Sequence, residues 1–215
     1  MSHGTNNKID YTFPFNTCEK KREIIAQPYS VFVNLINCVI ILYFLLKTTK
    51  FHTFLFIFII LCFELFHVFS HSLHIEGNIQ VNITHTLSYA INFALLYTLY
   101  KRTNILPSTL FIIYYIFLII TDIYVFNNYN VVLQIFTQAL LFLSVIAYFY
   151  NTFSNKIKNN MFYIFICVFI IIGLFINEKI NCKYMMEKYP NFPFHAIIEV
   201  VAIMFFYLLC KSFYN

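Results

Sequence analysis

Ionisable side chains lie inside or at the edges of the long apolar segments of this chain. They are Glu64, His67, His71 and His74 in one segment, His85 at the start of the next, Asp122 late in another, and His195 and Glu199 at the start of the last. An ionisable group in hydrocarbon costs free energy, so such residues are rare unless they do chemistry. Imidazole and carboxylate together are typical ligands of a divalent metal. The residue types therefore predict a metal site within a membrane.

Two of these residues share one helical face. His195 and Glu199 are four positions apart, the spacing at which helical side chains lie one above the other. A ligand from a second helix would complete three protein ligands with an open position for water, as in catalytic zinc sites. We assign His74, His195 and Glu199 as ligands of Zn²⁺, which produces a nucleophile from bound water near neutral pH. Ser70, one turn before His74, would donate a hydrogen bond to the oxyanion, and His85 would transfer protons.

Other interpretations of the same residues compete with this assignment. His71 is the alternative to His74, because a shift of one helical turn in depth would bring it level with the last segment's ligands. His67 is interpreted as a hydrogen-bonded packing residue, the usual role of a lone intramembrane histidine. Glu64 lies about 15 Å below His74 along a helix, so we expect it to pair with His67 or another polar helix face. Asp122 fits equally well as a cap at a helix end.

The composition is that of an integral membrane protein. Of 215 residues, 60% are hydrophobic and 11% are charged, and the mean hydropathy is +0.73, so too little polar surface exists to cover a water-soluble globule. Segments long enough to cross roughly 30 Å of hydrocarbon recur at about 30–47, 51–74, 83–100, 105–126, 131–150, 160–177 and 193–213. Because only helices and closed barrels satisfy their backbone in lipid, we predict an all-α bundle of seven transmembrane helices over 30–215. A polar N-terminal tail, 1–29, precedes it, and the longest connection is expected at 177–193.

Basic residues are spread over the tail and the short loops. The net charge is +5, and its dispersion excludes a concentrated nucleic-acid surface. One side of the predicted bundle carries Lys47, Lys50, Lys101, Arg102, Lys156, Lys158 and Lys211. Since cytosolic loops are enriched in Lys and Arg, this side is expected to be cytosolic. The C-terminus would then be cytosolic and the N-terminus lumenal, in the endoplasmic reticulum or Golgi membrane, although the tail and the loop after the sixth segment are basic too.

Two of the six cysteines lie outside the apolar segments. Cys18 in the tail and Cys182 after the sixth segment fall on the same side of a bundle with an odd number of spans. If that side is oxidising, a disulfide between them is compatible with the sequence. Two unrelated loop cysteines are equally compatible, because connectivity cannot be deduced from sequence alone.

Three local patterns resemble the alkaline ceramidases, within the wider group of seven-helix hydrolases that includes the adiponectin and progestin receptors. They are the segment from Cys18 to Pro28 followed by Asn34-Leu35-Ile36-Asn37, the pair Ser70 and His74, and His195-Ala196 with Glu199. In number and order of spans, the resemblance covers nearly the whole chain. It implies a zinc-dependent amidase that cleaves a ceramide-like membrane lipid to a fatty acid and a sphingoid base. It also implies a disulfide between Cys18 and Cys182.

The chain departs from the family at functional positions. Glu199 stands where the family has a second histidine on the last helix, and His85 stands where it has an aspartate. The tail retains Glu19 but replaces the other groups expected around calcium with Thr17, Lys20, Lys21 and Gln27, which disfavours calcium as a regulator. Two further functions stay open: a seven-helix lipid receptor whose metal is structural, and a proton or metal transporter that uses the deep polar residues as a relay.

Overall fold

The computed structural model describes residues 18–20, 22, 24–73, 78–127 and 131–214, with the side chains of 78–81 and 131 excepted. Over these residues the chain forms seven α-helices and a single 3-10 turn, η1. The helices are α1 (Pro28–Lys47), α2 (Phe51–Ser72), α3 (Asn78–Thr103), α4 (Thr109–Asn127), α5 (Val131–Phe149), α6 (Asn155–Lys188) and α7 (Phe194–Phe213), and η1 is Tyr150–Thr152. The prediction of an all-α helical membrane bundle is confirmed.

Judged on the described residues, six of the helices are long and apolar enough to cross a membrane, namely α1, α2 and α4 to α7. The helix outside this group is α3, which is long enough at roughly 39 Å but carries a polar face. That face includes His85, Ser88 and Asn92, and it lowers the mean hydropathy of the helix. The polar residues therefore point to burial of α3 against its neighbours rather than to a position outside the bundle.

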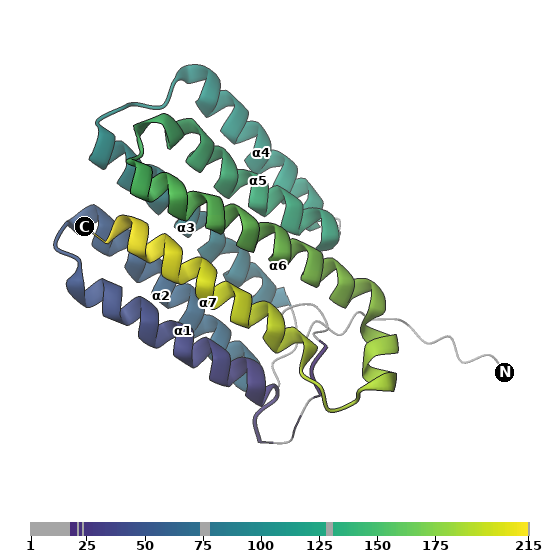
Figure 1. Ribbon diagram of the computed structural model, residues 1–215. Coiled ribbons are helices and arrows are strands. Elements are labelled where there is room, and N and C mark those ends of the chain that lie inside the picture. The colour runs from purple at the N-terminus through teal and green to yellow at the C-terminus, as the bar shows by residue number, and fades with distance from the viewer. Residues whose placement is uncertain (1–17, 21, 23, 74–77, 128–130, 215) are drawn as a thin grey trace.

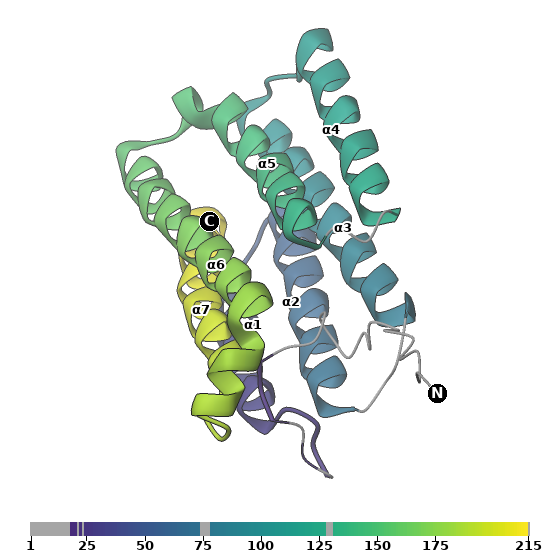
Figure 2. The same ribbon diagram turned by 90° about the vertical axis from the view of Figure 1, so that its right-hand side faces the viewer.

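The helices pack mainly against the elements next to them in sequence, as expected for antiparallel spans joined by short loops. Helices α1, α2 and α7 lie together, α6 runs beside α7, and α4 runs beside α5 (Figures 1 and 2). Because α1 and α7 are in direct contact, the first and last spans close the bundle. This closure places the end of α2 beside the start of α7, where His71, His195 and Glu199 lie.

Helix α6 is longer than the sequence indicated. The predicted span ended at 177 and was followed by a loop, but the helix continues to Lys188, so the prediction of a long connection at 177–193 is wrong. Its 34 residues extend about 51 Å, well beyond the hydrocarbon thickness. No glycine or proline interrupts the segment between Gly173 and Pro190, so polar residues there continue the helix outside the apolar region. Only 189–193 connect α6 to α7.

The described part of the tail lies against the end of the bundle where α1 and α7 begin. Glu19 accepts hydrogen bonds from the backbone N–H groups of Tyr29 (2.9 Å) and Ser30 (3.3 Å), which satisfies donors in the first turn of α1 that have no helical partner. The backbone N–H of Gln27 donates to the carbonyl of His71 at 2.9 Å. A disulfide joins Cys18 to Cys182 on α6, so the pairing that the resemblance implied is confirmed.

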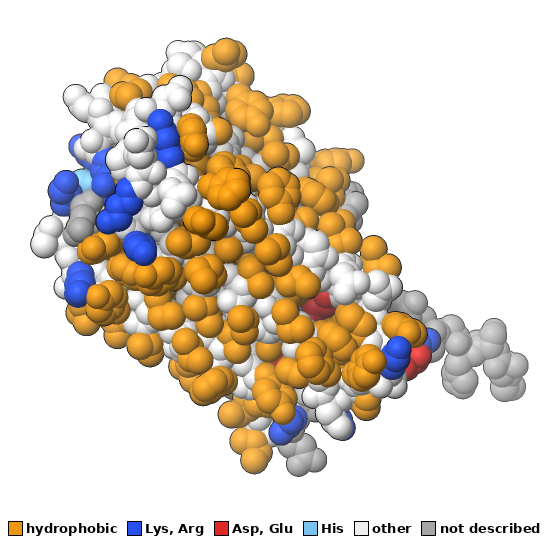
Figure 3. Space-filling view, viewed as in Figure 1, with side chains coloured by type: hydrophobic (Ala, Val, Ile, Leu, Met, Phe, Trp, Pro, Cys, Tyr) orange, Lys and Arg blue, Asp and Glu red, His pale blue; other side chains and the backbone are white. Residues whose placement is uncertain are grey.

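The surface between the two ends of the bundle is largely apolar (Figure 3). Lys and Arg side chains gather at the end where the C-terminus lies, and others lie near the end of α6 (Figure 3). This distribution is that of an integral membrane protein. The cytosolic assignment of the C-terminal end, and the organelle, stay predictions.

Candidate metal centre

Three potential metal ligands from two helices converge inside the bundle. His71 comes from the last turn of α2, and His195 and Glu199 come from the start of α7. One ligand atom from each residue lies within 4.8 Å of the others. The Oε1 atom of Glu199 is 3.5 Å from Nε2 of His71 and 3.1 Å from Nε2 of His195. The three residues are 0%, 2% and 8% exposed, so the cluster is screened from bulk water.

Helix geometry and packing together bring these atoms to one point. The four-residue spacing places His195 and Glu199 on one face of α7, as the sequence predicts. The bundle then sets the imidazole of His71 opposite them, with its ring centroid 5.2 Å from that of His195. A single imidazole–carboxylate pair would be a local feature of α7, whereas the third group makes the site a property of the tertiary structure.

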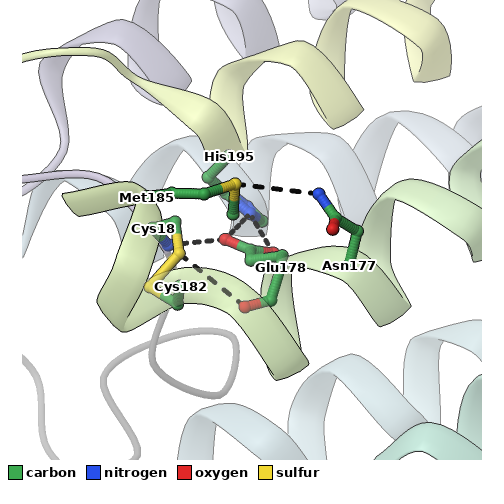
Figure 4. Close-up of a disulfide and its surroundings, with 6 residues drawn as sticks. All are labelled: Cys18, Asn177, Glu178, Cys182, Met185 and His195. Atoms are coloured by element: carbon green, nitrogen blue, oxygen red, sulfur yellow. Dashed lines mark hydrogen bonds and ion pairs between the residues drawn. A yellow bond between two sulfur atoms is a disulfide. The ribbon is translucent and has the colours of Figure 1, made fainter. Parts of the chain in front are cut away.

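The remaining ring nitrogens of both histidines are held by acceptors. Nδ1 of His71 donates to the side-chain oxygen of Gln27 in the tail. Nδ1 of His195 lies 3.1 Å from both carboxylate oxygens of Glu178 on α6, as Figure 4 shows. An acceptor at Nδ1 places the ring proton there and leaves the Nε2 lone pair available, which is the arrangement that outer partners impose on metal-ligating histidines.

The donor set fits a divalent cation. Nε2 of His195 is buried and forms no hydrogen bond of acceptable geometry with a described residue, although Glu199 is 3.1 Å away. A buried polar atom without a hydrogen bond is costly, and a cation between the three groups would remove that cost. Two imidazoles and one carboxylate are a ligand set of catalytic zinc, but other divalent metals accept the same donors. The site is therefore a possible metal centre whose preferred ion the geometry leaves open.

An elongated cavity of about 320 Å³ lies beside the ligands. His195 and Glu199 contribute to its wall, and further lining residues follow α7 as far as Leu209, about 21 Å along the helix. His67 and Glu64 of α2 also line it, and most of the remaining wall is apolar side chains of α3, α5 and α6. A site of this kind, apolar with few polar groups at one place, is typical of a pocket for a small amphipathic ligand.

The structure brings some of the predicted site residues together and separates others. His195 and Glu199 lie in the cluster with His71, the alternative to His74. His74 lies outside the described residues, so its role as a ligand stays a prediction. Ser70 is on α2 next to His71, and its buried hydroxyl oxygen has no hydrogen-bond partner among the described residues. Its contribution to an oxyanion site also stays a prediction.

His85 belongs to a second polar cluster, formed by α3, α4 and α5. Its Nε2 is 2.6 Å from a carboxylate oxygen of Asp122, which is fully buried. Asp122 also accepts hydrogen bonds from Tyr89 (2.6 Å), Thr137 and Gln138. Asp122 is thus a buried acceptor that joins three helices rather than a cap at a helix end. Among the described residues, the His85 ring contacts Asp122, Tyr89 and the stacked ring of Phe126.

The predictions for two other residues of α2, His67 and Glu64, agree with the structure in part. His67 donates from Nδ1 to the carbonyl of Phe63 at 3.0 Å, as expected of a hydrogen-bonded residue, but its side chain also lines the cavity. Glu64 is 2% exposed and lies deeper in the bundle, where one of its oxygens has no hydrogen-bond partner among the described residues. It is not one of the three clustered ligands.

Sequence reasoning missed Gln27 and Glu178 as partners of the ligands. Glu178 was placed in the predicted loop after the sixth span, where a carboxylate carries no special meaning. The signal that could have identified it is its position directly after an apolar segment, since an acid at membrane depth is rare without a partner. Gln27 lay in the polar tail and offered no comparable signal.

These observations describe an all-helical membrane protein with a buried His-His-Glu triad that could hold a metal ion. No family model matches the chain, and neither a curated protein nor a solved structure matches it.

Proposed function

We propose that the protein is an intramembrane zinc-dependent amidase that cleaves the N-acyl bond of ceramide-like lipids. The observation that carries the proposal is the convergence of His71, His195 and Glu199 beside an apolar cavity, whose wall includes His195 and Glu199. A structural metal site is normally closed by four protein ligands, whereas a catalytic one keeps a position open for water or substrate. Three clustered ligands beside a cavity match the second arrangement.

Residues around the ligands would keep the site ready for the metal. Gln27 and Glu178 fix the tautomer of each histidine, so that Nε2 of both rings faces the same point. Bound there, zinc supplies a Lewis acid for the scissile carbonyl and lowers the pKa of a coordinated water. The buried hydroxyl of Ser70 is the group that we assign to stabilise the oxyanion. Its missing hydrogen-bond partner among the described residues supports this assignment.

The cavity favours a lipid substrate over a water-soluble amide. Its wall follows α7 for about 21 Å and includes Phe205, Phe206 and Leu209, which would exclude water and orient an acyl chain along the helix. The polar atoms of His195 and Glu199 would then meet the amide at the headgroup end. Hydrolysis adds water across the C–N bond and releases a fatty acid and the amine of a sphingoid base.

The placement of His85 favours a second candidate function. This residue was assigned to proton transfer, but its Nε2 is 2.6 Å from Asp122 in a separate cluster. If no other group takes over the proton transfer assigned to His85, turnover would be slow, and the protein would act as a lipid-binding receptor in which the metal has a structural role. The two candidates share the metal centre and differ in turnover.

The test measures metal content and turnover on the same sample. Full-length protein is purified in detergent, its metals are quantified by mass spectrometry, and defined ceramides are supplied while free fatty acid is measured. We expect one equivalent of zinc and release of fatty acid, with both lost in His195→Ala. His52→Ala, on the opposite end of α2, is the matched control and should change neither. Metal without product would favour the receptor, and protein without metal in the presence of added zinc would refute the metal centre.

A further inference from the structure

A second pocket, of about 280 Å³, opens at the end of the bundle where the tail meets α1 and α7. Among the described residues it is lined by Glu19, Lys20, Arg22, Tyr29, Asn191 and Pro193. It shares none of these residues with the cavity beside the metal centre. The pocket is therefore a separate site made by the tail and by the connection between α6 and α7.

The carboxylate in this pocket is already used by the fold. Its Oε1 atom accepts from the backbone N–H of Tyr29, and its Oε2 atom accepts from the backbone N–H and the hydroxyl of Ser30. Glu19 is 5% exposed. Because N–H and O–H donors point at both oxygens, a cation would have to share these oxygens with the donors at the start of α1. The negative charge of Glu19 therefore serves the helix N-terminus, where an anion is stabilising.

The exposed side chains of the pocket are hydrogen-bond donors, and two of them are cationic. Lys20 and Arg22 are exposed to solvent, and the guanidinium of Arg22 lies over the ring of Tyr29, 5.4 Å from its centroid. Arg22 also donates to the hydroxyl of Tyr29 at 3.3 Å. Asn191 adds an amide. Among the described residues the pocket thus offers two cationic side chains and an amide, and Arg and Lys are the residues that bind phosphate.

The pocket lies directly beside the metal centre. Pro193 is two residues before His195, which limits the separation of their Cα atoms to about 7.6 Å. Cys18, next to Glu19, donates its backbone N–H to Glu178 at 2.5 Å and accepts from the backbone N–H of His195 at 3.4 Å. A molecule held in the pocket would thus lie close to the start of α7, which carries two of the candidate metal ligands.

We propose that this pocket binds a phosphate group, and that in the membrane this group is the phosphomonoester headgroup of a lipid. Lys20 and Arg22 would neutralise its charge, and Asn191 would donate a hydrogen bond to its oxygens. Phosphate binding by the pocket does not depend on the metal centre. A second role of the pocket, in which it selects N-acyl lipids with an anionic headgroup as substrates, rests on the proposed amidase function.

The experiment measures binding rather than turnover. Full-length protein in detergent is titrated with dihexanoyl phosphatidic acid, with dihexanoylglycerol as the neutral counterpart, and with inorganic phosphate. We expect the phosphate lipid to bind at least tenfold more tightly than the neutral lipid. The double variant Lys20→Gln/Arg22→Gln should lose about 25-fold, because each basic residue near an anionic lipid contributes roughly fivefold. Phosphate that binds as tightly as the lipid identifies the free ion as ligand, and much weaker binding of phosphate identifies the headgroup.

A matched variant controls for charge at the same end of the protein. Lys183→Gln/Lys188→Gln removes two exposed lysines of α6 that do not line the pocket, and it should leave binding within twofold. Equal losses in the two double variants, or equal affinity for the charged and the neutral lipid, would overturn the proposal. The titration is repeated after removal of metal with a chelator. If phosphate binding is unchanged without metal while the intact protein shows no turnover, the phosphate proposal stands and the amidase proposal fails.

Discussion

Replacement of Glu178 by glutamine tests whether α6 prepares the metal centre. Glu178 accepts from Nδ1 of His195 at 3.1 Å and from the backbone N–H of Cys18 at 2.5 Å, contacts that Figure 4 shows together. The glutamine is nearly isosteric but has one oxygen and an NH₂ group in place of two oxygens. Oε1 accepts from both Cys18 and His195, whereas Oε2 contacts only His195. An oxygen that stays with Cys18 therefore leaves the NH₂ group in the place of Oε2, where a donor in place of an acceptor and the loss of the negative charge weaken the hold on the Nδ1 proton. The tautomer that keeps the Nε2 lone pair for a metal is then less favoured.

The size of the effect follows from the single contact that is changed. Loss of an outer partner of a ligating histidine typically weakens metal binding by about 10-fold to 100-fold, which corresponds to roughly 1.4 to 2.8 kcal/mol. Loss of a ligand itself is far more costly, because a site with two protein ligands holds zinc weakly. We therefore expect Glu178→Gln to weaken zinc binding by about 10-fold to 100-fold, and His195→Ala to abolish stoichiometric binding.

The measurement is a competition between the purified protein and a chelator of known zinc affinity. Glu187→Gln removes the same charge from an exposed site nine residues further along α6 and should leave the zinc affinity within twofold. Thermal unfolding of the metal-free variants checks that the substitution at 178 preserves the fold. If Glu178→Gln binds zinc as tightly as the control while remaining folded, the contact to His195 does not prepare the ligand and the reasoning is wrong.

Three further predictions follow from the cavity, the ligands and the disulfide. His71→Ala should remove the bound metal whereas His74→Ala should retain it, as read by metal analysis of both proteins; the reverse result would restore the ligand set assigned from sequence. Ala202→Trp should fill part of the cavity and reduce turnover at least tenfold with full metal content, because it blocks the acyl chain without touching a ligand. Val200→Trp, at a lipid-exposed position of the same helix, is its control in the fatty-acid assay, and equal losses would exclude the cavity as the substrate site. Cys182→Ser should destabilise the protein by about 2–4 kcal/mol and lower its melting temperature, and an unchanged melting temperature would show that the crosslink adds no stability.

The sequence was sufficient to predict the helices. A span of about 20 apolar residues has few alternatives in lipid, and each predicted segment corresponds to a helix that begins and ends within a few residues of the predicted limits, with α6 as the main exception. The extension of α6 to Lys188 was not predicted, because hydropathy identifies only the residues that lie in lipid. The polar turns of a helix that continues outside the membrane give no apolar signal. Here the polar turns are held by Cys182 in its disulfide and by Glu178 against His195.

Part of the candidate metal centre was also determined locally. His195 and Glu199 are on one face of α7 because the α-helix repeats every 3.6 residues, whatever surrounds it. The third ligand depends on the depth and rotation of α2 relative to α7, which no periodicity within α2 specifies, and the structure brings His71 to that position. Gln27 and Glu178 meet the same histidines from segments far away in sequence. The spacing within α7 thus determined which of its residues could bind one metal together. Packing between helices, which depends on side chains all along their contacts, decided which residue of α2 lies opposite them.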